Sequence, residues 1–401
     1  MRPLPSKPVY MDNHATTRVD PRVVAAMLPY LTEKFGNAGS TSHVFGWEAK
    51  DAVDAARETI AAAIGASPRE VVFTSGATES NNLAIRGVCE WPRRRGDHLV
   101  CVVTEHRAVL DPLAKLARGG FEVTQLPVKP NGADDAGTID LDQLSEAIRD
   151  DTVLVSVMLA NNEIGVLQPL VEIGRICKQR GVLLHTDATQ AVGKIAVDVD
   201  RLQVDLMSFS AHKIYGPKGI GALYVRQRAP QVRLQSQIDG GRQEAGRRSG
   251  TLNVPGIVGF AEALQLCLAG LPAEAERLRR MRDRLFVGLC SRVPNVALNG
   301  PALERTELRL SGNLNCSFTD VDGEALMLSM RDLAVSSGSA CTSAEPEPSH
   351  VLRALGLSDE LARASLRFGL GRFNTDEEVD FAIDTVAASV ERLRKLRSDA
   401  I

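Results

Sequence analysis

Lys213 lies in a polar stretch between two apolar runs, residues 204–207 and 220–225. Both runs have the length and composition of short strands, so the sequence predicts a tight turn after the first strand. Gly216 and Gly219 let the backbone of this turn bend sharply and approach a ligand. A lysine held there can form a Schiff base with a carbonyl compound. The stretch alone is equally compatible with a solvated loop lysine.

Other predicted strands also end in polar residues. The strand at 71–73 is followed by a loop of small residues, 74–80, which opens a helix where free N–H groups and hydroxyls bind phosphate. The strands at 99–103, 153–158 and 182–184 are followed by His106, Asn162, Asp187 and Gln190. Singly, each residue has an ordinary explanation as a helix cap or turn residue. Because ligands of open α/β sheets bind beyond the carboxyl ends of the strands, we expect these residues to converge at one sheet edge.

The strands that position these residues alternate with helices. Helices are predicted after three of the strands, at 78–88, 107–118 and 169–180. This alternation predicts an α/β fold with a mostly parallel central sheet and helices on both faces. An earlier helix, 47–64, is expected to carry Trp47 and Val53 on one apolar face.

The character of the sequence changes near residue 255. One long helical stretch, 256–292, leads into short strands and helices that predict a smaller α+β domain. The N-terminal segment is expected to pack on that domain. The predicted division is therefore a large domain over 20–262 and a small domain that combines 1–19 with 263–401.

The overall composition excludes several classes of protein. The chain has 401 residues, 44% of them hydrophobic, and a formal net charge of −3, so no basic field favours nucleic acid. No apolar run approaches the roughly 20 residues that cross a membrane, and the N-terminus lacks the apolar stretch of a secretory signal. Seven cysteines, with no Cys-x-x-Cys pair, argue against a disulfide framework or a structural zinc site. We therefore expect a cytoplasmic protein with neither nucleic-acid nor membrane partners.

The candidate residues fit the needs of one cofactor, pyridoxal 5'-phosphate. It requires an amine for a Schiff base, which Lys213 offers, and a phosphate cradle at a helix N-terminus. It also requires a carboxylate beside the pyridine nitrogen, and Asp187 suits this place because a nearby negative charge favours the pyridinium. His106 could stack on the ring and move protons. No dinucleotide glycine motif lies between a strand and a helix, no P-loop occurs, and the histidines are not closely paired as in a metal site.

Cys341 is a further candidate. Its segment, 336–343, lacks bulky side chains and predicts a mobile, accessible loop. Free cysteines are usually buried, so a cysteine displayed on such a loop is a candidate nucleophile. An incidental loop cysteine is the alternative.

With these residues assembled, the chain resembles the cysteine desulfurases, pyridoxal-phosphate enzymes of the class V aminotransferase family, over residues 9–396. The motifs that match lie at 15–17, 75–80, 104–106, 161–165, 187–190, 212–213, 248–251 and 336–343. The loop around Cys341, about 335–345, is similar to that of the housekeeping desulfurases that feed iron–sulfur cluster assembly. The resemblance implies a fold-type I pyridoxal-phosphate transferase that converts L-cysteine to L-alanine and leaves a persulfide on Cys341.

The resemblance also implies roles around the cofactor. Lys213 forms the Schiff base and moves the substrate proton, Asp187 pairs the pyridine nitrogen, and Gln190 bonds the phenolate oxygen. His106 stacks on the ring. The residues expected to hold the phosphate are Ala77, Thr78, Ser210, His212 and, from the neighbouring subunit of a homodimer, Thr251.

On the substrate side, the resemblance implies that Asn162 and Arg367 hold the carboxylate of L-cysteine, a bidentate task that suits arginine. Asn162 is also expected to contact the cofactor. The sulfur on Cys341 would pass to an iron–sulfur scaffold protein or to tRNA thiolation, and Cys341 is a candidate ligand of a transient iron–sulfur cluster. The chain departs from the family pattern at Arg242 and Ala245, where the family has glycine and arginine in a dimer-contact loop.

Two other functions remain open on the sequence. One is another class V enzyme, an aminotransferase or selenocysteine lyase, which would share Lys213 and Asp187 but not depend on Cys341 and His106. The other is a non-catalytic sulfur-relay scaffold with a vestigial site, which would not bind the cofactor.

Overall fold

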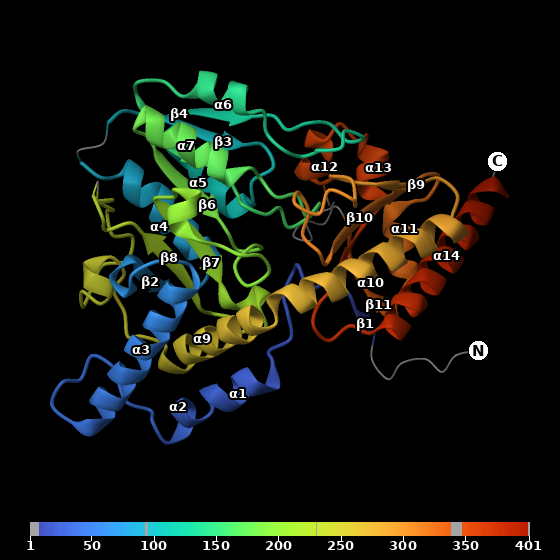
Figure 1. The fold of residues 1–401 in the computed structure, drawn as a ribbon. Helices are drawn as coiled ribbons and strands as arrows, with labels where there is room; N and C mark the ends of the chain where they lie inside the picture. The colour runs from blue at the N-terminus through green and yellow to red at the C-terminus, as the bar shows by residue number, and fades with distance from the viewer. Residues whose placement is uncertain (1–7, 93–94, 230, 338–346, 400–401) are drawn as a thin grey trace.

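The computed structural model describes residues 8–92, 95–229, 231–337 and 347–399 (Figure 1). Its central sheet has seven strands in the order β2-β8-β7-β6-β5-β3-β4. These are β2 (Val71–Thr74), β3 (His98–Val102), β4 (Glu122–Leu126), β5 (Thr152–Ser156), β6 (Leu183–Asp187), β7 (Leu206–Ser210) and β8 (Gly221–Val225). All neighbouring strands are parallel except β8, which is antiparallel to both β2 and β7. The predicted α/β class with a mostly parallel sheet is confirmed.

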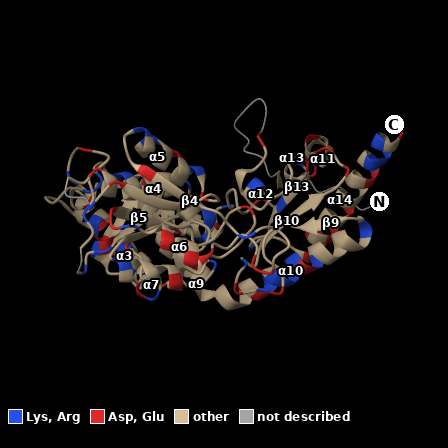
Figure 2. Cartoon of the chain, turned by 90° about the horizontal axis from the view of Figure 1, so that it is seen from above, with Lys and Arg blue, Asp and Glu red and all other residues tan. Residues whose placement is uncertain are grey.

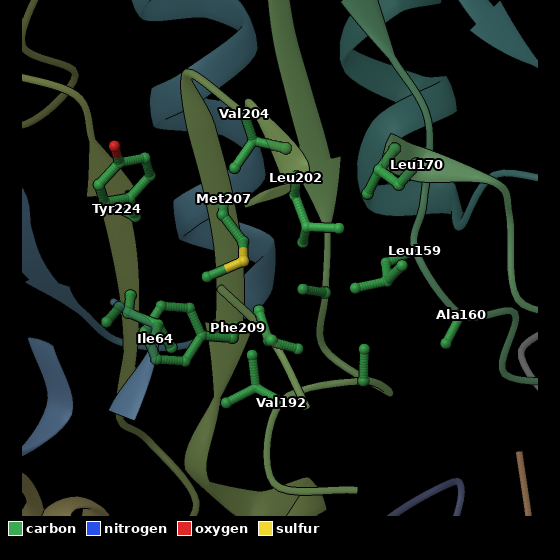
Figure 3. Close-up of a cluster of buried hydrophobic side chains, with 14 of the residues drawn as sticks. Ile64, Leu159, Ala160, Leu170, Val192, Leu202, Val204, Met207, Phe209 and Tyr224 are labelled. Carbon is green, nitrogen blue, oxygen red and sulfur yellow. The ribbon is translucent and has the colours of Figure 1, made fainter. Parts of the chain in front are cut away.

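Both faces of this sheet are buried, which explains why its strands are apolar on both sides. Side chains alternate along a strand, so Met207 and Phe209 of β7 join Tyr224 of β8 in a core cluster on one face (Figure 3). Leu206 and Leu223 enter the cluster on the opposite face. Met207 lies opposite Tyr224 in the register. A shift of one residue would turn these side chains to the other face, so the packing on both faces fixes the register and with it the end of each strand.

Helices cover the two faces of the sheet. One face is covered by α4 (Ala77–Cys89) and α5 (Arg107–Arg118). The other is covered by α3 (Val44–Ala63), α6 (Leu141–Ala147), α7 (Leu170–Arg180), α8 (Val199–Leu202) and α9 (Val254–Ala269). The predictions of α4, α5 and α7 are confirmed to within a residue or so at each end. The sequence reading missed β4, whose Glu122 and Gln125 are exposed at the sheet edge, and the short α6.

The first turn of α3 differs from the prediction. The helix begins at Val44, and the expectation that Trp47 lies on its buried face is wrong, since Trp47 is 53% exposed while Val53 is buried. In Figure 1 this end of α3 lies away from the sheet, near α1 (Pro21–Met27) and α2 (Pro29–Thr32). There is no sheet beneath Trp47 for it to pack on.

A second core lies in the C-terminal third. It contains a sheet with the order β12-β13-β10-β9, whose paired strands are antiparallel. Its strands and helices are α10 (Leu271–Arg292), β9 (Val296–Leu298), β10 (Asn313–Phe318), α11 (Gly323–Ser329), β12 (Ser336–Ser337), α12 (His350–Ala354), α13 (Asp359–Arg363), β13 (Ser365–Gly369) and α14 (Asp376–Ser398). Figure 2 shows both signs of charge along α10 and α14, and ion pairs such as Arg284–Asp380 join the two helices.

The N-terminal strand β1 (Val9–Tyr10) belongs to this second core, where it pairs in parallel with β11 (Leu333–Ala334). Met11 is fully buried in the same cluster. The chain then crosses to the central sheet, where Thr17 Oγ1 donates to the carbonyl oxygen of His212. The N-terminal segment therefore bridges the two cores beside the lysine turn.

The long stretch predicted to be helical over 256–292 is helical, but it is not one helix. It is two helices, α9 and α10, bent by 74° and separated at Gly270. Pro272 follows at the start of α10, and proline cannot continue a helix because it lacks the N–H and clashes with the preceding turn. The predicted domain boundary at 262 falls inside α9. In the part of the chain that is described, no single helix is long and apolar enough to cross a membrane, and α9 and α10 reach that length and apolarity only as this bent pair.

Candidate functional site

A cavity of about 1220 Å³ opens at the carboxyl ends of the central strands. The predicted residues that line it are Ala77, Thr78, His106, Asn162, Asp187, Gln190, Ser210, His212, Lys213 and Arg367. Thr251 does not line it and is exposed just before α9. Cys341 lies outside the described residues, but residues on both sides of its segment, Ser337 and Glu347, line the cavity.

Lys213 ends a short 3-10 turn, Ala211–Lys213, directly after β7. Its Nζ donates to the carbonyl oxygens of His14 and Ala15, both at 2.6 Å. Burial, and then the charge of Arg367, lower the pKa of Lys213 to about 8. A lowered pKa raises the fraction of neutral amine, which is the form that attacks a carbonyl group.

Asp187 ends β6 and is 5% exposed. Its Oδ2 accepts a hydrogen bond from Asn81 Nδ2 at 2.8 Å, and its Oδ1 accepts one from the backbone N–H of Thr189 at 2.9 Å. These two donors hold the carboxylate at one place in the cavity wall. The sequence-based prediction did not identify Asn81, although an asparagine on the buried side of α4 could have indicated a residue of the site.

The N-terminus of α4 faces the same cavity. Within the described residues no side chain caps this helix, and its first residues, Ala77 and Thr78, line the cavity. The first N–H groups of a helix have no partner within it, so they are available to an anion. A Cβ at Gly221 would lie 2.7 Å from the Cα of Gly76, so only glycine lets β8 approach this loop so closely. Burial, and then Lys213, lower the pKa of the neighbouring His212 to about 4, which keeps its ring neutral.

His106 is the N-cap of α5, and its Nδ1 accepts a hydrogen bond from the N–H of Ala108 at 3.0 Å. Its ring is exposed at the cavity wall and is available to stack. The preceding Glu105 is fully buried, and burial holds the pKa of its carboxyl well above the usual range. Its Oε1 accepts from the N–H of Met158 at 2.6 Å, and Oε2 has no partner among the described residues. The sequence reading gave Glu105 no role.

The far side of the cavity comes from the second core. Arg367 of β13 donates from Nη2 to Asp12 Oδ1 at 2.7 Å and to Ser336 Oγ at 2.9 Å, and from Nη1 to the carbonyl oxygen of Asn162 at 3.1 Å. Its Nε has no partner in the described part of the chain. The guanidinium is therefore fixed by three distant segments, while its Nε has no partner among the described residues. Asp12 and Ser336 were not foreseen as its partners.

Gln190 lies next to Lys213, since both side chains donate to the carbonyl oxygen of His14. Its Oε1 accepts from Lys194 Nζ at 2.6 Å and faces His14 Nδ1 at 3.2 Å, and its Nε2 donates to the carbonyl oxygen of His14 at 2.8 Å. The sequence reading identified Gln190 but neither His14 nor Lys194.

The loop with the two departures from the family pattern packs against α3 and β2. Glu244 accepts from both Nη atoms of Arg57 and from the N–H of Phe73. Arg242 and Ala245 adopt left-handed conformations, with φ of 59° and 56°. These conformations disfavour residues with a Cβ. No cluster of metal-ligating side chains occurs among the residues described.

The profile of the aminotransferase class-V family matches residues 9–381. The chain belongs to this family. It is 56% identical over 389 residues to the cysteine desulfurase IscS of Methylococcus capsulatus (strain Bath), an alignment that covers 97% of this chain and 94% of that protein. The predicted resemblance to the class V cysteine desulfurases is confirmed.

Solved structures agree with this assignment. A NifS-like protein superposes with a TM-score of 0.87 at 38% identity, covering 96% of this chain and 100% of that one. A structure of SspA in complex with cysteine superposes with a TM-score of 0.78 at 37% identity, covering 91% and 99% of the two chains. The fold is that of the pyridoxal-phosphate enzymes of fold type I, as predicted.

Class V enzymes depend on pyridoxal phosphate, and the cavity fits it. An amine with a lowered pKa, a buried carboxylate and an uncapped helix N-terminus face one space. These are the groups needed for a Schiff base, for a protonated pyridine nitrogen and for a phosphate.

Proposed function

We propose that this chain is a pyridoxal-phosphate-dependent cysteine desulfurase that converts L-cysteine to L-alanine, while Cys341 takes the sulfur as a persulfide for iron–sulfur cluster assembly. One observation carries the proposal: Lys213, Asp187 and Arg367 face a single cavity whose wall includes both flanks of the Cys341 segment. Relatives named as IscS cysteine desulfurases, over nearly the whole chain, support it.

When bound, pyridoxal phosphate supplies the electron sink that allows the Cα–H bond of the substrate to break. Asp187 holds a proton on the pyridine nitrogen, since its carboxylate stabilises the adjacent positive charge. Lys213 takes the proton from Cα, a task suited to an amine whose pKa is lowered to about 8. Arg367, with its unsatisfied Nε, and Asn162 hold the substrate carboxylate.

The sulfur transfer balances without an added oxidant. The Cys341 thiolate attacks the substrate sulfur, so that an S–S bond forms as the C–S bond breaks. The electron pair of the broken bond stays on the substrate Cβ, which gains a proton, and Lys213 returns a proton to Cα before alanine leaves. We propose His106 as the proton carrier, because its ring is exposed at the cavity wall.

The test is turnover of L-cysteine by the cofactor-loaded chain, with alanine quantified and Cys341 examined by mass spectrometry for one added sulfur. Cys341→Ser is expected to abolish alanine formation, and Lys213→Ala to remove both turnover and the visible absorbance of the bound cofactor. Cys290→Ser, at the one exposed cysteine among those described, is the matched control and is expected to keep full turnover. Undiminished alanine formation by Cys341→Ser would refute the desulfurase mechanism.

We propose further that the enzyme is a homodimer. Exposed apolar side chains crowd the region of α1, α2 and the start of α3, and they are Val24, Leu28, Leu31, Phe35, Val44, Phe45 and Trp47. A contiguous exposed apolar patch is typical of an interaction surface. Thr251, proposed to reach the partner's phosphate site, precedes α9, which packs against α1 and α3. Phe35→Asp is expected to yield monomers in sedimentation analysis, whereas Leu396→Asp, at an exposed position on α14, is expected to leave the assembly unchanged.

The destination of the sulfur completes the proposal. We propose that the Cys341 persulfide is handed to an iron–sulfur scaffold protein in the cytoplasm, with tRNA thiolation as a second outlet and Cys341 as a transient cluster ligand. The six described cysteines are free thiols, as expected in a reducing compartment. Cluster formation on a purified scaffold protein, dependent on L-cysteine and lost in Cys341→Ser, is the direct measurement.

A further inference from the structure

The side-chain amide of Gln190 has its orientation determined by its neighbours. Lys194 Nζ lies 2.6 Å from Oε1, and the charged amine, which has no lone pair, can only donate to it. On the other side of the amide, Nε2 lies 2.8 Å from the carbonyl oxygen of His14, which can only accept. Exchanging the oxygen and nitrogen would leave both contacts repulsive, so the amide has one permitted orientation.

The same contacts determine the state of His14. Its Nδ1 faces Gln190 Oε1 at 3.2 Å, so Nδ1 carries the proton. Its Nε2 is buried without a partner in the described structure, and burial, then Lys194, hold the pKa of the ring well below its usual range. His14 therefore remains a neutral donor to Gln190, and it cannot replace Lys194 as a source of orientation if the amide rotates.

The permitted orientation directs the N–H of Gln190 toward the lysine turn. Gln190 Nε2 and Lys213 Nζ donate to the same carbonyl oxygen of His14, so these two nitrogens are neighbours. A phenolate oxygen next to the Schiff base needs a donor, and a C=O group in that place would repel it. The orientation of this amide thus decides whether Gln190 helps or hinders the binding of the cofactor.

The position of Lys194 is set by the turn that carries it. The preceding Gly193 has φ of 76°, and a Cβ there would lie 2.8 Å from Ile214 Cγ2, so this turn packs directly on the lysine turn. Lys194 has no carboxylate within salt-bridge distance among the described residues. It lines a second cavity of about 500 Å³, where Glu274 is paired with Arg277.

The charges around Lys194 are mostly positive. Burial, and then Lys213, lower its pKa to about 7, with Arg367 acting in the same direction and Cys267 opposing it. Arg372, on the wall of the second cavity, is paired with Asp20. Both the charged and the neutral amine can donate to Gln190 Oε1, and the charged amine, which has no acceptor, excludes the exchanged orientation of the amide.

We propose that Lys194 is a positioning residue that locks Gln190 with its N–H toward the phenolate oxygen of the cofactor. The inference rests on the proposed function, which assigns Gln190 to that oxygen. It gives a role to Lys194, which has no assigned contact with the substrate and forms no ion pair with a carboxylate among the described residues.

The experiment compares cofactor affinity, measured by quenching of tryptophan fluorescence as pyridoxal phosphate is added to the apo chain. Lys194→Met, which keeps the length of the side chain but cannot donate, is expected to weaken binding about tenfold, the typical loss of a hydrogen bond to a charged group. Lys194→Arg, which keeps the donor, is expected to lie within about threefold of the parent chain. Lys115→Met, at an exposed site on α5, is the control and should bind as the parent does.

A second readout separates this role from a general structural one. The visible absorbance of the bound cofactor is titrated with pH, and its midpoint is expected to rise in Lys194→Met. Both a donor to the phenolate and a nearby positive charge favour loss of the Schiff-base proton. Combining Lys194→Met with Gln190→Ala is expected to add less than about twofold to the loss of affinity caused by Gln190→Ala alone, because the lysine acts through the glutamine.

The outcomes are distinguishable. Parent affinity and an unchanged midpoint in Lys194→Met would overturn this inference and leave the proposed function standing, as would additive losses in the double variant. Failure of the parent chain to bind pyridoxal phosphate at all would overturn the proposed function itself. If Lys194→Met does not fold, Lys194→Leu, which also lacks a donor and is smaller, is measured in its place and is expected to bind about tenfold more weakly than the parent. Parent affinity there would overturn the inference.

Discussion

The two walls of the cavity are built in different ways. Asp187, Ser210 and Lys213 each lie at or just after the end of a central strand, and the packing of one sheet sets their spacing. Arg367 and Ser336 come from the second core, where side-chain contacts to Asp12 hold them. The first wall takes its geometry from the packing of one sheet, and the second adds hydrogen bonds between distant segments to the packing of its own core.

The two walls of the cavity have different tasks. Groups that must stay fixed relative to the cofactor ring lie on the sheet wall, where a shift would disturb close-packed side chains on both faces. Arg367, proposed to hold the substrate carboxylate, and Ser337 and Glu347, which flank the Cys341 segment, lie on the other wall. We expect variants of the sheet wall to affect the chemical step, and variants of the other wall to affect substrate binding.

The largest effect is expected on the sheet wall from Asp187→Asn. The substitution preserves size but removes the negative charge, so kcat is expected to fall about 10²- to 10³-fold with little change in KM. Steady-state kinetics check this, with Asp142→Asn on the exposed side of α6 as the control. A rise in KM at unchanged kcat would contradict the assignment of Asp187 to the chemical step.

The next effect concerns the pH dependence of folding and comes from β6, the strand that also carries Asp187. His185 of β6 is fully buried between Ser156 Oγ and Ser208 Oγ, and burial lowers its pKa to about 4. The unfolded chain binds a proton near pH 6.5 and the folded chain only near pH 4, so the stability supplied by neutral His185 is lost as pH falls between these values. The linked loss is on the order of 3 kcal/mol.

Urea unfolding at pH 7 and pH 5 measures this dependence. The parent chain is expected to lose more stability between these pH values than His185→Gln, which cannot titrate. Equal losses in the two chains would show that His185 does not carry the effect. His14 and His212, whose pKa values are also lowered, contribute in the same direction and remain in both chains.

On the wall from the second core, Arg367→Lys is expected to raise KM for L-cysteine roughly 10- to 100-fold while kcat changes little. Lysine cannot reproduce the fork that donates to Asp12, Ser336 and a carboxylate at once. Arg363→Lys, at an exposed position on α13, is the control. A fall in kcat as large as that of Asp187→Asn would mean that the two walls do not divide the work as described.

The smallest effect is expected at a loop that belongs to neither wall. Arg242 has φ of 59°, so Arg242→Gly relieves backbone strain but makes the unfolded chain more flexible. The net gain in the free energy of unfolding is expected to be below about 1 kcal/mol. Gln243→Gly, at φ of −56°, has no strain to relieve and is expected to destabilise. Thermal unfolding of both variants tests the contrast in sign.

The same contrast explains what could be predicted from sequence. The sheet wall follows from local patterns, since each strand and the polar residue after it are adjacent in the chain, as with Lys213 and Asp187. Asn81 could have been found by asking which polar residues lie on the buried side of α4. The partners of Arg367 could not be found in this way, because 355 residues separate it from Asp12. Trp47 and the break at Gly270 were missed for a related reason: periodicity indicates a helix without showing what lies beneath it.

The pairing of the N-terminal strand with the second core can form only late in the synthesis of the chain. Asp12 and Ser336 are 324 residues apart, and ribosomes add roughly 5–20 residues per second. The strand at Val9–Tyr10 therefore waits on the order of tens of seconds for β11 to be synthesised. During that wait, the central sheet can form its cofactor wall while the substrate wall does not yet exist. An unfinished chain could thus bind the cofactor before it could bind cysteine. Sulfur transfer would then begin only after the whole chain has been synthesised.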